Sequence, residues 1–128
     1  MNLDINSTKP IYIQIAEWIE NEILVGHFKT EEKVFSQYKL AEVFNINPAT
    51  AAKGLNLLSD EGILYTKRGL GKFVTADAKH IIQQKRKNGT LKGLILDSVR
   101  EAKRLKVSEQ ELMEMITKAH KEIEGDEA

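Results

Sequence analysis

The chain has 128 residues, of which 41% are apolar and 30% charged, and this composition predicts one compact domain, or a small domain with an appendage, rather than disorder. It contains 19 basic and 19 acidic residues and no cysteine, which excludes disulfides, thiolate catalysis and cysteine-based metal sites. Uninterrupted apolar runs are too short to cross a bilayer, and the first residues lack the apolar stretch of a signal peptide. We therefore expect a cytoplasmic protein with no membrane partner.

The neutral total hides a segregation of charge along the chain. Residues 1–75 carry 8 basic and 9 acidic side chains, residues 76–107 carry 9 and 3, and residues 108–128 carry 2 and 7. A basic segment followed by an acidic one favours pairing within the chain or across a dimer. Two solvated helix faces are the alternative interpretation.

The first predicted element is a helix that begins at Pro10 and ends at Gly26. Proline suits a first helical turn, because its missing N–H would be unpaired there, and glycine accepts the positive φ that ends a helix. Apolar residues follow at helical spacing between these signals: Ile11, Ile15, Trp18, Ile19 and Ile23.

Two short helices joined by a tight turn come next. Ser36 is the expected N-cap of the first, and Asn45 fits the turn because asparagine tolerates the left-handed conformation. Asn47 followed by a proline starts the second helix, which ends near Gly62. This order is typical of a helix-turn-helix.

A β-hairpin is predicted directly after these helices. Residues 63–66 and 72–75 form two short strands, joined by a basic turn that contains Gly69 and Gly71. The two glycines allow tight turning and close approach of the backbone to another group. A hairpin in this place is the wing of a winged helix.

Only helices are predicted after residue 78. A basic stretch over residues 80–87 ends at Asn88-Gly89, a turn signal, and Thr90 is expected to cap a further helix. Ser108 opens a capping box for the last helix. Two amphipathic helices cannot enclose a core by themselves, so they must pack on the N-terminal domain of the same chain or on a second copy. We expect the second arrangement, a four-helix interface in a homodimer, and a folded-back monomer is the alternative. The predicted dimerisation residues are Leu91, Leu94, Ile95, Val99, Ala102, Leu112, Met115, Ile116, Ala119 and Ile123.

Five short runs, taken together, resemble the GntR family of bacterial transcription regulators. They are residues 10–15 (PIYIQI), 40–44 (LAEVF), 47–53 (NPATAAK), 61–64 (EGIL) and 68–74 (RGLGKFV). The short tail resembles the YtrA-type subfamily, whose members dimerise through two C-terminal helices. The resemblance implies a mainly α fold with a small β-hairpin wing: a winged helix-turn-helix DNA-binding domain over residues 1–76 and a helical dimerisation region over residues 77–128.

The resemblance also implies which residues contact double-stranded DNA. The helix that begins near Asn47 would enter the major groove, and the wing would reach the minor groove or the backbone. The implied DNA-binding residues are Ser36, Tyr38, Lys39, Asn47, Ala49, Thr50, Lys53, Arg68, Gly69 and Gly71. Helix N-termini and hydroxyls suit phosphates, and a lysine can reach guanine acceptors. Each residue also has an ordinary alternative as a cap, a solvated helix lysine or, for Arg68 and Lys72, a charge that keeps an edge soluble.

Two positions depart from the family's pattern. Phe35 replaces the usual proline, and Tyr38 replaces an arginine that commonly touches DNA. Tyrosine donates one hydrogen bond without charge or bidentate geometry, and Lys39 is placed to compensate. We therefore expect weaker or differently specific DNA binding.

The predicted function is a cytoplasmic repressor that binds a palindromic operator as a homodimer, with half-sites about 10 base pairs apart. The alternative is a dimeric protein-interaction module that has lost DNA binding, which Tyr38 and the neutral total charge suggest. An enzyme is disfavoured: the three histidines have no metal-ligand spacing and no glycine-rich phosphate loop is present, so we expect no cofactor and no metal. A small-molecule effector, if one binds, would have to lie between the domains or in the helical seam of the dimer.

Overall fold

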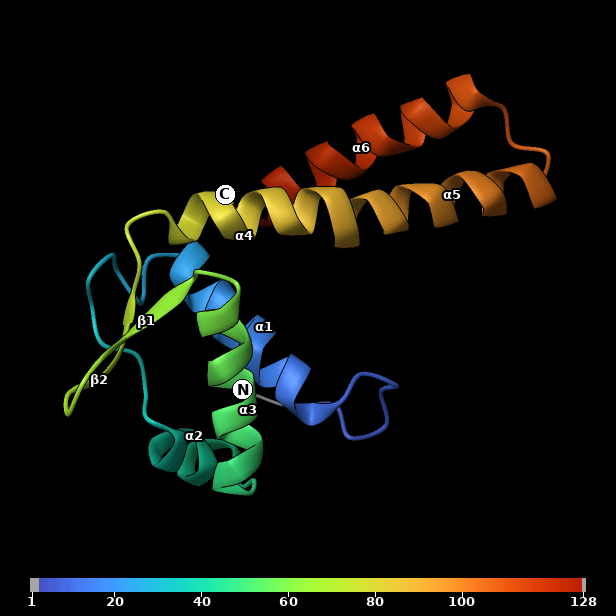
Figure 1. Cartoon of the computed structure of the whole chain (residues 1–128). Helices are drawn as coiled ribbons and strands as arrows, with labels where there is room; N and C mark the ends of the chain where they lie inside the picture. The colour runs from blue at the N-terminus through green and yellow to red at the C-terminus, as the bar shows by residue number, and fades with distance from the viewer. Residues whose placement is uncertain (1–2, 128) are drawn as a thin grey trace. The chain divides into compact units, whose positions relative to one another are not determined.

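A computed structural model describes residues 3–127, and the chain divides into two compact units between Gln84 and Lys85. The mainly helical fold with a β-hairpin wing is confirmed (Figure 1). The N-terminal unit contains, in order, α1 (Ile11–Leu24), α2 (Gln37–Phe44), α3 (Pro48–Asp60), β1 (Leu64–Lys67), β2 (Gly71–Val74) and most of α4 (Ala78–Arg86).

The predicted helix-turn-helix forms with the expected caps. The Ser36 hydroxyl accepts a hydrogen bond from the Lys39 amide at 3.1 Å, and the Asn47 side chain accepts one from the Ala49 amide at 2.8 Å. Asn45 adopts the left-handed conformation, with φ of 54°, between the two helices. Local capping chemistry therefore determines where α2 ends and α3 begins.

The helices of this unit share one core, in which α3 packs against both α1 and α2. Gly54 allows α3 to approach α1 very closely. A Cβ added at this position would lie only 2.8 Å from the Tyr12 carbonyl oxygen and 3.1 Å from Ile15 Cγ2. The fully or almost fully buried apolar side chains include Ile15, Ile19, Ile23, Leu40, Ala51, Leu55, Leu58, Ile63, Leu64, Val74, Ala78 and Ile82.

Phe35, which replaces the family's proline, has a structural role. Its ring lies 5.3 Å from that of Phe28 and 5.9 Å from that of Trp18, and Trp18 also contacts Phe44 at 5.1 Å. The four rings form an aromatic cluster between α1, α2 and the segment that joins them. Such pairs stabilise by about 0.5–1.5 kcal/mol beyond their buried area.

The hairpin strands are shifted by one residue from the prediction and pair antiparallel from Leu64↔Val74 to Lys67↔Gly71. A third segment adds to the other edge of β2. There the Val34 amide donates to the Lys72 carbonyl and Lys33 pairs with Phe73. The wing is therefore supported by the polar stretch that precedes α2.

The sequence was misleading at Asn88-Gly89, where the predicted turn and the helix cap at Thr90 are both wrong. The helix continues from α4 through a π-helical segment, η1 (Lys87–Leu91), into α5 (Lys92–Arg104). The Lys92 amide donates to the Lys87 carbonyl, five residues back. This wider hydrogen-bonding pattern keeps the helix continuous in spite of residues that favour turns.

The C-terminal unit holds α5 and α6 (Glu109–Glu127), which begins as predicted with the Ser108 hydroxyl accepting from the Glu111 amide at 3.1 Å. Most of the predicted dimerisation residues are exposed here: Leu94 is 59% exposed, Ile95 52%, Met115 55% and Ile116 48%. Ala102 is the buried exception.

The N-terminal compact unit extends beyond the predicted domain boundary at residue 76. Ala78 and Ile82 are buried in its core, so the first part of α4 belongs to this unit. The functional division into residues 1–76 and 77–128 stays a prediction. No helix among residues 3–127 is long and apolar enough to cross a membrane.

Candidate nucleic-acid interface

The first candidate group lies at the start of α2. Tyr38 is 70% exposed, and Ser36 and Lys39 are exposed beside it. The Ser36 oxygen accepts the capping bond, so its O–H proton remains free to be donated to a phosphate. The start of a helix also concentrates partial positive charge, which favours an anion at this place.

The second group forms an exposed stripe on α3. Ala49, Lys53 and Asn56 are exposed at positions four and then three residues apart, while Ala51 and Leu55 face the core. The same helix therefore buries one face and leaves the opposite one free along its length. Thr50 is half-buried and Asn47, at the cap, is exposed.

Asn56 was missed from the sequence, although the spacing of the buried residues would have found it. It lies on the same stripe as Lys53, and an asparagine amide can donate to and accept from adenine. The helical periodicity of Ala51, Leu55 and Leu58 already excludes position 56 from the core.

Lys53 is placed by a contact that joins α3 to α1. Its ammonium lies 4.1 Å from the centre of the Tyr12 ring. A cation over an aromatic face at an exposed site gains about 0.5–1 kcal/mol. This contact holds the Lys53 side chain against α1, while the residue stays exposed on the stripe.

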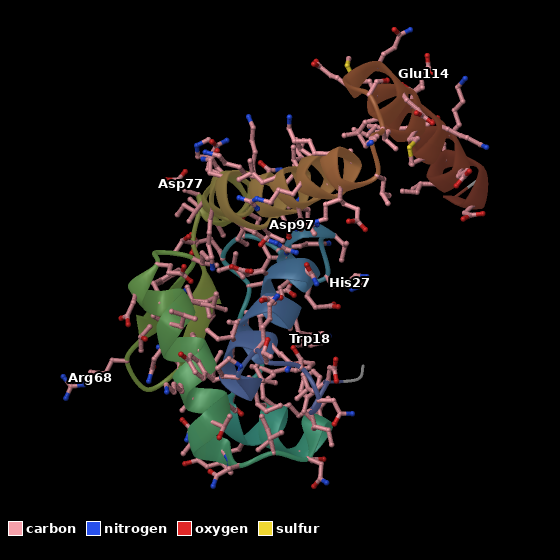
Figure 2. All side chains as sticks on the ribbon, turned by 90° about the vertical axis from the view of Figure 1, so that its right-hand side faces the viewer. Trp18, His27, Arg68, Asp77, Asp97 and Glu114 are labelled. Atoms are coloured by element: carbon pink, nitrogen blue, oxygen red, sulfur yellow. The ribbon has the colours of Figure 1, made fainter. Side chains whose placement is uncertain are left out.

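The third group is the tip of the wing. Arg68 lies there and points away from the hairpin (Figure 2). Gly69 has a φ of 78° and no neighbour within 4 Å of an added Cβ, so the turn geometry alone requires glycine there. Gly71, with a φ of 117°, is different, because an added Cβ would lie 2.8 Å from Lys33 Cε.

Lys72 connects the wing to α3. Its ammonium donates to Ser59 Oγ at 2.8 Å and to Thr66 Oγ1 at 3.0 Å, and the side chain is half-buried. Sequence reasoning treated this lysine as a charge that keeps an edge soluble. The bond to Ser59 instead holds the hairpin against the end of α3, whose stripe is exposed, while the bond to Thr66 joins the two strands of the hairpin.

The outer face of the hairpin carries an additional hydrogen bond. The Tyr65 hydroxyl donates to the Glu31 carboxylate, and this bond raises the pKa of Tyr65 above its ordinary value, with smaller effects of desolvation and of the negative charge. The bond occupies a carboxylate beside the hairpin's aromatic pair, Tyr65 and Phe73.

None of the ten implied DNA-binding residues is buried, and the packing of α2 and β1 against α3 holds their three groups on one unit. Exposed cations, hydroxyls and amides suit a polyanion with readable base edges. Among the described residues, no three His, Asp or Glu side chains gather where they could hold a metal ion. The DNA contacts of the individual residues stay predictions.

Seven of the ten predicted dimerisation residues line one groove of the C-terminal unit, between α5 and α6, whereas Met115, Ala119 and Ile123 lie outside it. Its volume is about 780 Å³, and Leu94, Ile95, Val99 and Ile116 are among its lining residues. Leu96, although 43% exposed, does not line it. The part of these residues in a dimer stays a prediction as well.

Comparison with known proteins gives consistent matches. The family described as bacterial regulatory proteins, gntR family, matches residues 11–74. The HTH-type transcriptional repressor YtrA of Bacillus subtilis (strain 168) is 33% identical over 101 residues, which cover 77% of this chain and 78% of that protein.

Two solved structures extend the comparison. A GntR family transcriptional regulator from Listeria monocytogenes superposes with a TM-score of 0.74 at 32% identity, over 91% of this chain and 98% of the other. The DNA-binding domain of AraR, solved in complex with its operator ORE1, gives a TM-score of 0.52 at 29% identity, over 57% of this chain and 89% of that one.

Proposed function

The chain belongs to the gntR family of bacterial regulatory proteins and is a transcriptional regulator with a DNA-binding domain, and we propose that it is a cytoplasmic repressor that binds a palindromic operator as a homodimer. As a member of this family it is a DNA-binding protein and not an enzyme. Repression is proposed because YtrA, its relative of similar length, is a repressor.

The observation that carries the proposal is the exposed stripe of α3. Its side chains can enter a major groove because the helix is capped at Asn47, buries its opposite face and begins at the surface. In the proposed complex, Lys53 and Asn56 read base edges, Ser36 and Lys39 contact phosphates, and Arg68 reaches toward the minor groove. Tyr38 supplies a neutral hydrogen bond in place of an arginine.

Homodimerisation is supported by the C-terminal unit. Isoleucines and leucines of α5 and α6 are about half exposed within a single chain, which is costly in water. The segment that contains α5 is strongly basic and the one that contains α6 strongly acidic, so a second copy can cover the apolar residues and pair the charges. Two-fold symmetry then requires a two-fold operator.

The proposed DNA binding is tested by selection from random duplexes followed by titration of the recovered sequence. We expect a palindrome with half-sites about 10 base pairs apart, and an affinity that falls steeply with salt. Lys53→Ala should weaken binding to the palindrome by about 1–3 kcal/mol if Lys53 reads a base. A dimer that enriches no sequence even at low salt would refute the proposal and favour a protein-interaction module.

The proposed interface is tested by two neighbouring substitutions on α5. Ile95→Lys places a charge in the groove, whereas Leu96→Lys places the same charge outside it. Light scattering should show a monomer for the first variant and a dimer for the second. If both variants remain dimers, the groove is not the interface.

For a small-molecule effector, we propose only the site at which it would bind. The groove between α5 and α6 is large enough for a small ligand and is lined mostly by apolar side chains. A ligand bound there would compete with the proposed dimer contacts. Its effect would therefore be measured as a change in dimer affinity.

A further inference from the structure

We propose that Lys33, which precedes the helix-turn-helix, binds a phosphate of the DNA backbone beside the groove that the wing enters. The inference rests on the proposed function, because it assigns an additional contact to the same DNA complex. Lys33 lies in a polar stretch that sequence reasoning left without a role. The tertiary structure connects it to the wing.

Backbone pairing fixes the position of Lys33. It lies opposite Phe73 of β2, flanked by the hydrogen bonds from the Val34 amide to the Lys72 carbonyl and from the Val74 amide to the Glu32 carbonyl, both 3.0 Å. Residues opposite each other in this kind of antiparallel pair place their side chains on the same face of the sheet. Lys33 therefore shares the outer face of the wing with Phe73.

The side chain of Lys33 extends over Gly71 toward the tip of the wing. Gly71 is two residues from Phe73 along β2, on the side of the turn, and an added Cβ there would lie 2.8 Å from Lys33 Cε and 3.6 Å from Lys33 Nζ. The lysine thus lies across the glycine, where any larger residue would displace it. The missing side chain of Gly71 serves this internal contact.

A second cation lies on the same face. Lys67 pairs with Gly71 across the hairpin, and its ammonium lies 4.3 Å from the centre of the Phe73 ring. Two lysines from segments more than thirty residues apart therefore flank the base of the turn that carries Arg68. Because both positive charges are on this face, an anion bound here is attracted by both.

The charge of Lys33 is free to meet that anion. Its side chain is exposed, and it makes no ion pair in the part of the chain that the structure describes. Of the two acidic residues that precede it, Glu31 accepts a hydrogen bond from the Tyr65 hydroxyl, and Glu32, the next residue along the extended segment, points to the opposite face. A wing inserted at a groove has phosphates on both sides, so an ammonium beside its tip meets one of them.

The test is the salt dependence of DNA binding by Lys33→Gln, which removes the charge and keeps an unbranched stem with a polar end. The control is Lys29→Gln, with the same change of charge at an exposed residue of the same stretch. Lys29 lies two residues before Glu31, whose amide donates to the carbonyl of Val74. Val74 is at the end of β2 that is far from the tip of the wing, so Lys29 is not beside the tip. Each variant and the wild type is titrated with the selected operator and with a random-sequence duplex at several salt concentrations.

We expect Lys33→Gln to make the slope of log affinity against log salt less steep by about 0.9 for each copy in the complex. The ratio of wild-type to variant affinity should therefore be about eightfold larger per copy at 0.1 M salt than at 1 M salt. The loss should be similar for both duplexes, because a phosphate contact carries no sequence information. Lys29→Gln should match the wild type. An unchanged slope for Lys33→Gln, or equal losses for both variants, overturns the assignment of Lys33 while the regulator proposal stands, whereas a wild type that binds neither duplex overturns both.

Discussion

Substituting Gly54 by alanine tests the close packing of α1 against α3. The added Cβ would lie 2.8 Å from the Tyr12 carbonyl oxygen and 3.1 Å from Ile15 Cγ2, so the two helices must separate. Overpacking of this kind costs about 1–3 kcal/mol, and the upper part of this range, about 2–3 kcal/mol, applies because the nearest atom belongs to the backbone and no side-chain rotation can relieve the contact. Alanine recovers about 1 kcal/mol of helix propensity relative to glycine, and neighbours in the core relax only in part. We expect a net destabilisation of about 1–2 kcal/mol for Gly54→Ala.

The assay is thermal unfolding followed by the fluorescence of Trp18. It is the only tryptophan of the chain and packs in the aromatic cluster, so its emission reports on the N-terminal unit. The midpoint should fall by roughly 5–15 °C, from about 4–8 °C per kcal/mol for a domain of this size.

The matched control is Asn56→Ala, at an exposed position of the same helix. This substitution gains about 0.5 kcal/mol of helix propensity and meets no neighbouring helix, so its midpoint should rise slightly. If Gly54→Ala also raises the midpoint, then α1 and α3 do not approach as closely as described, and the reason given for this glycine is wrong.

Three further variants test single contacts. Ser108→Ala removes the cap of α6 and should destabilise the C-terminal unit by about 1 kcal/mol, seen as a lower midpoint by circular dichroism; an unchanged midpoint would show that the cap contributes nothing. The hydrogen bond to Glu31 raises the pKa of Tyr65, so the bond stabilises the folded state fully below the ordinary value of 10.0 and this stabilisation is lost as pH rises through the raised value. The wild type should therefore lose more thermal stability above about pH 10 than Tyr65→Phe. Parallel pH profiles of the two proteins would contradict this. Lys72→Met should weaken operator binding about three- to tenfold without changing the salt slope, because the ammonium is bound by Ser59 rather than by phosphate; a lower slope would instead make Lys72 a DNA contact.

The sequence was most informative where structure depends on neighbouring residues. Ser36 and Asn47 cap the helices they were predicted to cap, and Asn45 adopts the left-handed conformation expected of it. These signals act over three residues, since a side chain only has to reach the next free amide. Together with the apolar spacing, they were sufficient to predict the winged helix-turn-helix.

Asn88-Gly89 shows where the same reasoning fails. The pair favours a turn, but the helical hydrogen bonds continue on both sides and the i→i−5 pattern accommodates them. Propensity is a weak local preference that a continuing helix overrides. No rule based on the two residues alone would have distinguished these outcomes.

The candidate site was incomplete for a different reason. Lys33 reaches the wing only because residues 32–34 pair with β2, forty residues later in the chain. Lys53 contacts Tyr12 of another helix in the same non-local way. Contacts of this kind depend on how elements pack, so the side chains they position are found only in the folded unit.

The π-helical segment Lys87–Leu91 gives the protein a site for limited proteolysis. All five residues are exposed in the single chain, and Gly89 and Asn88 are weak helix formers, so little besides the backbone hydrogen bonds stabilises this segment. Local opening there should expose Lys87 to limited trypsin digestion before the core unfolds. The N-terminal fragment retains every member of the buried core cluster, the last of which is Ile82, and the C-terminal fragment retains α5 and α6. Controlled proteolysis would therefore separate the two units of the regulator without redesigning its gene.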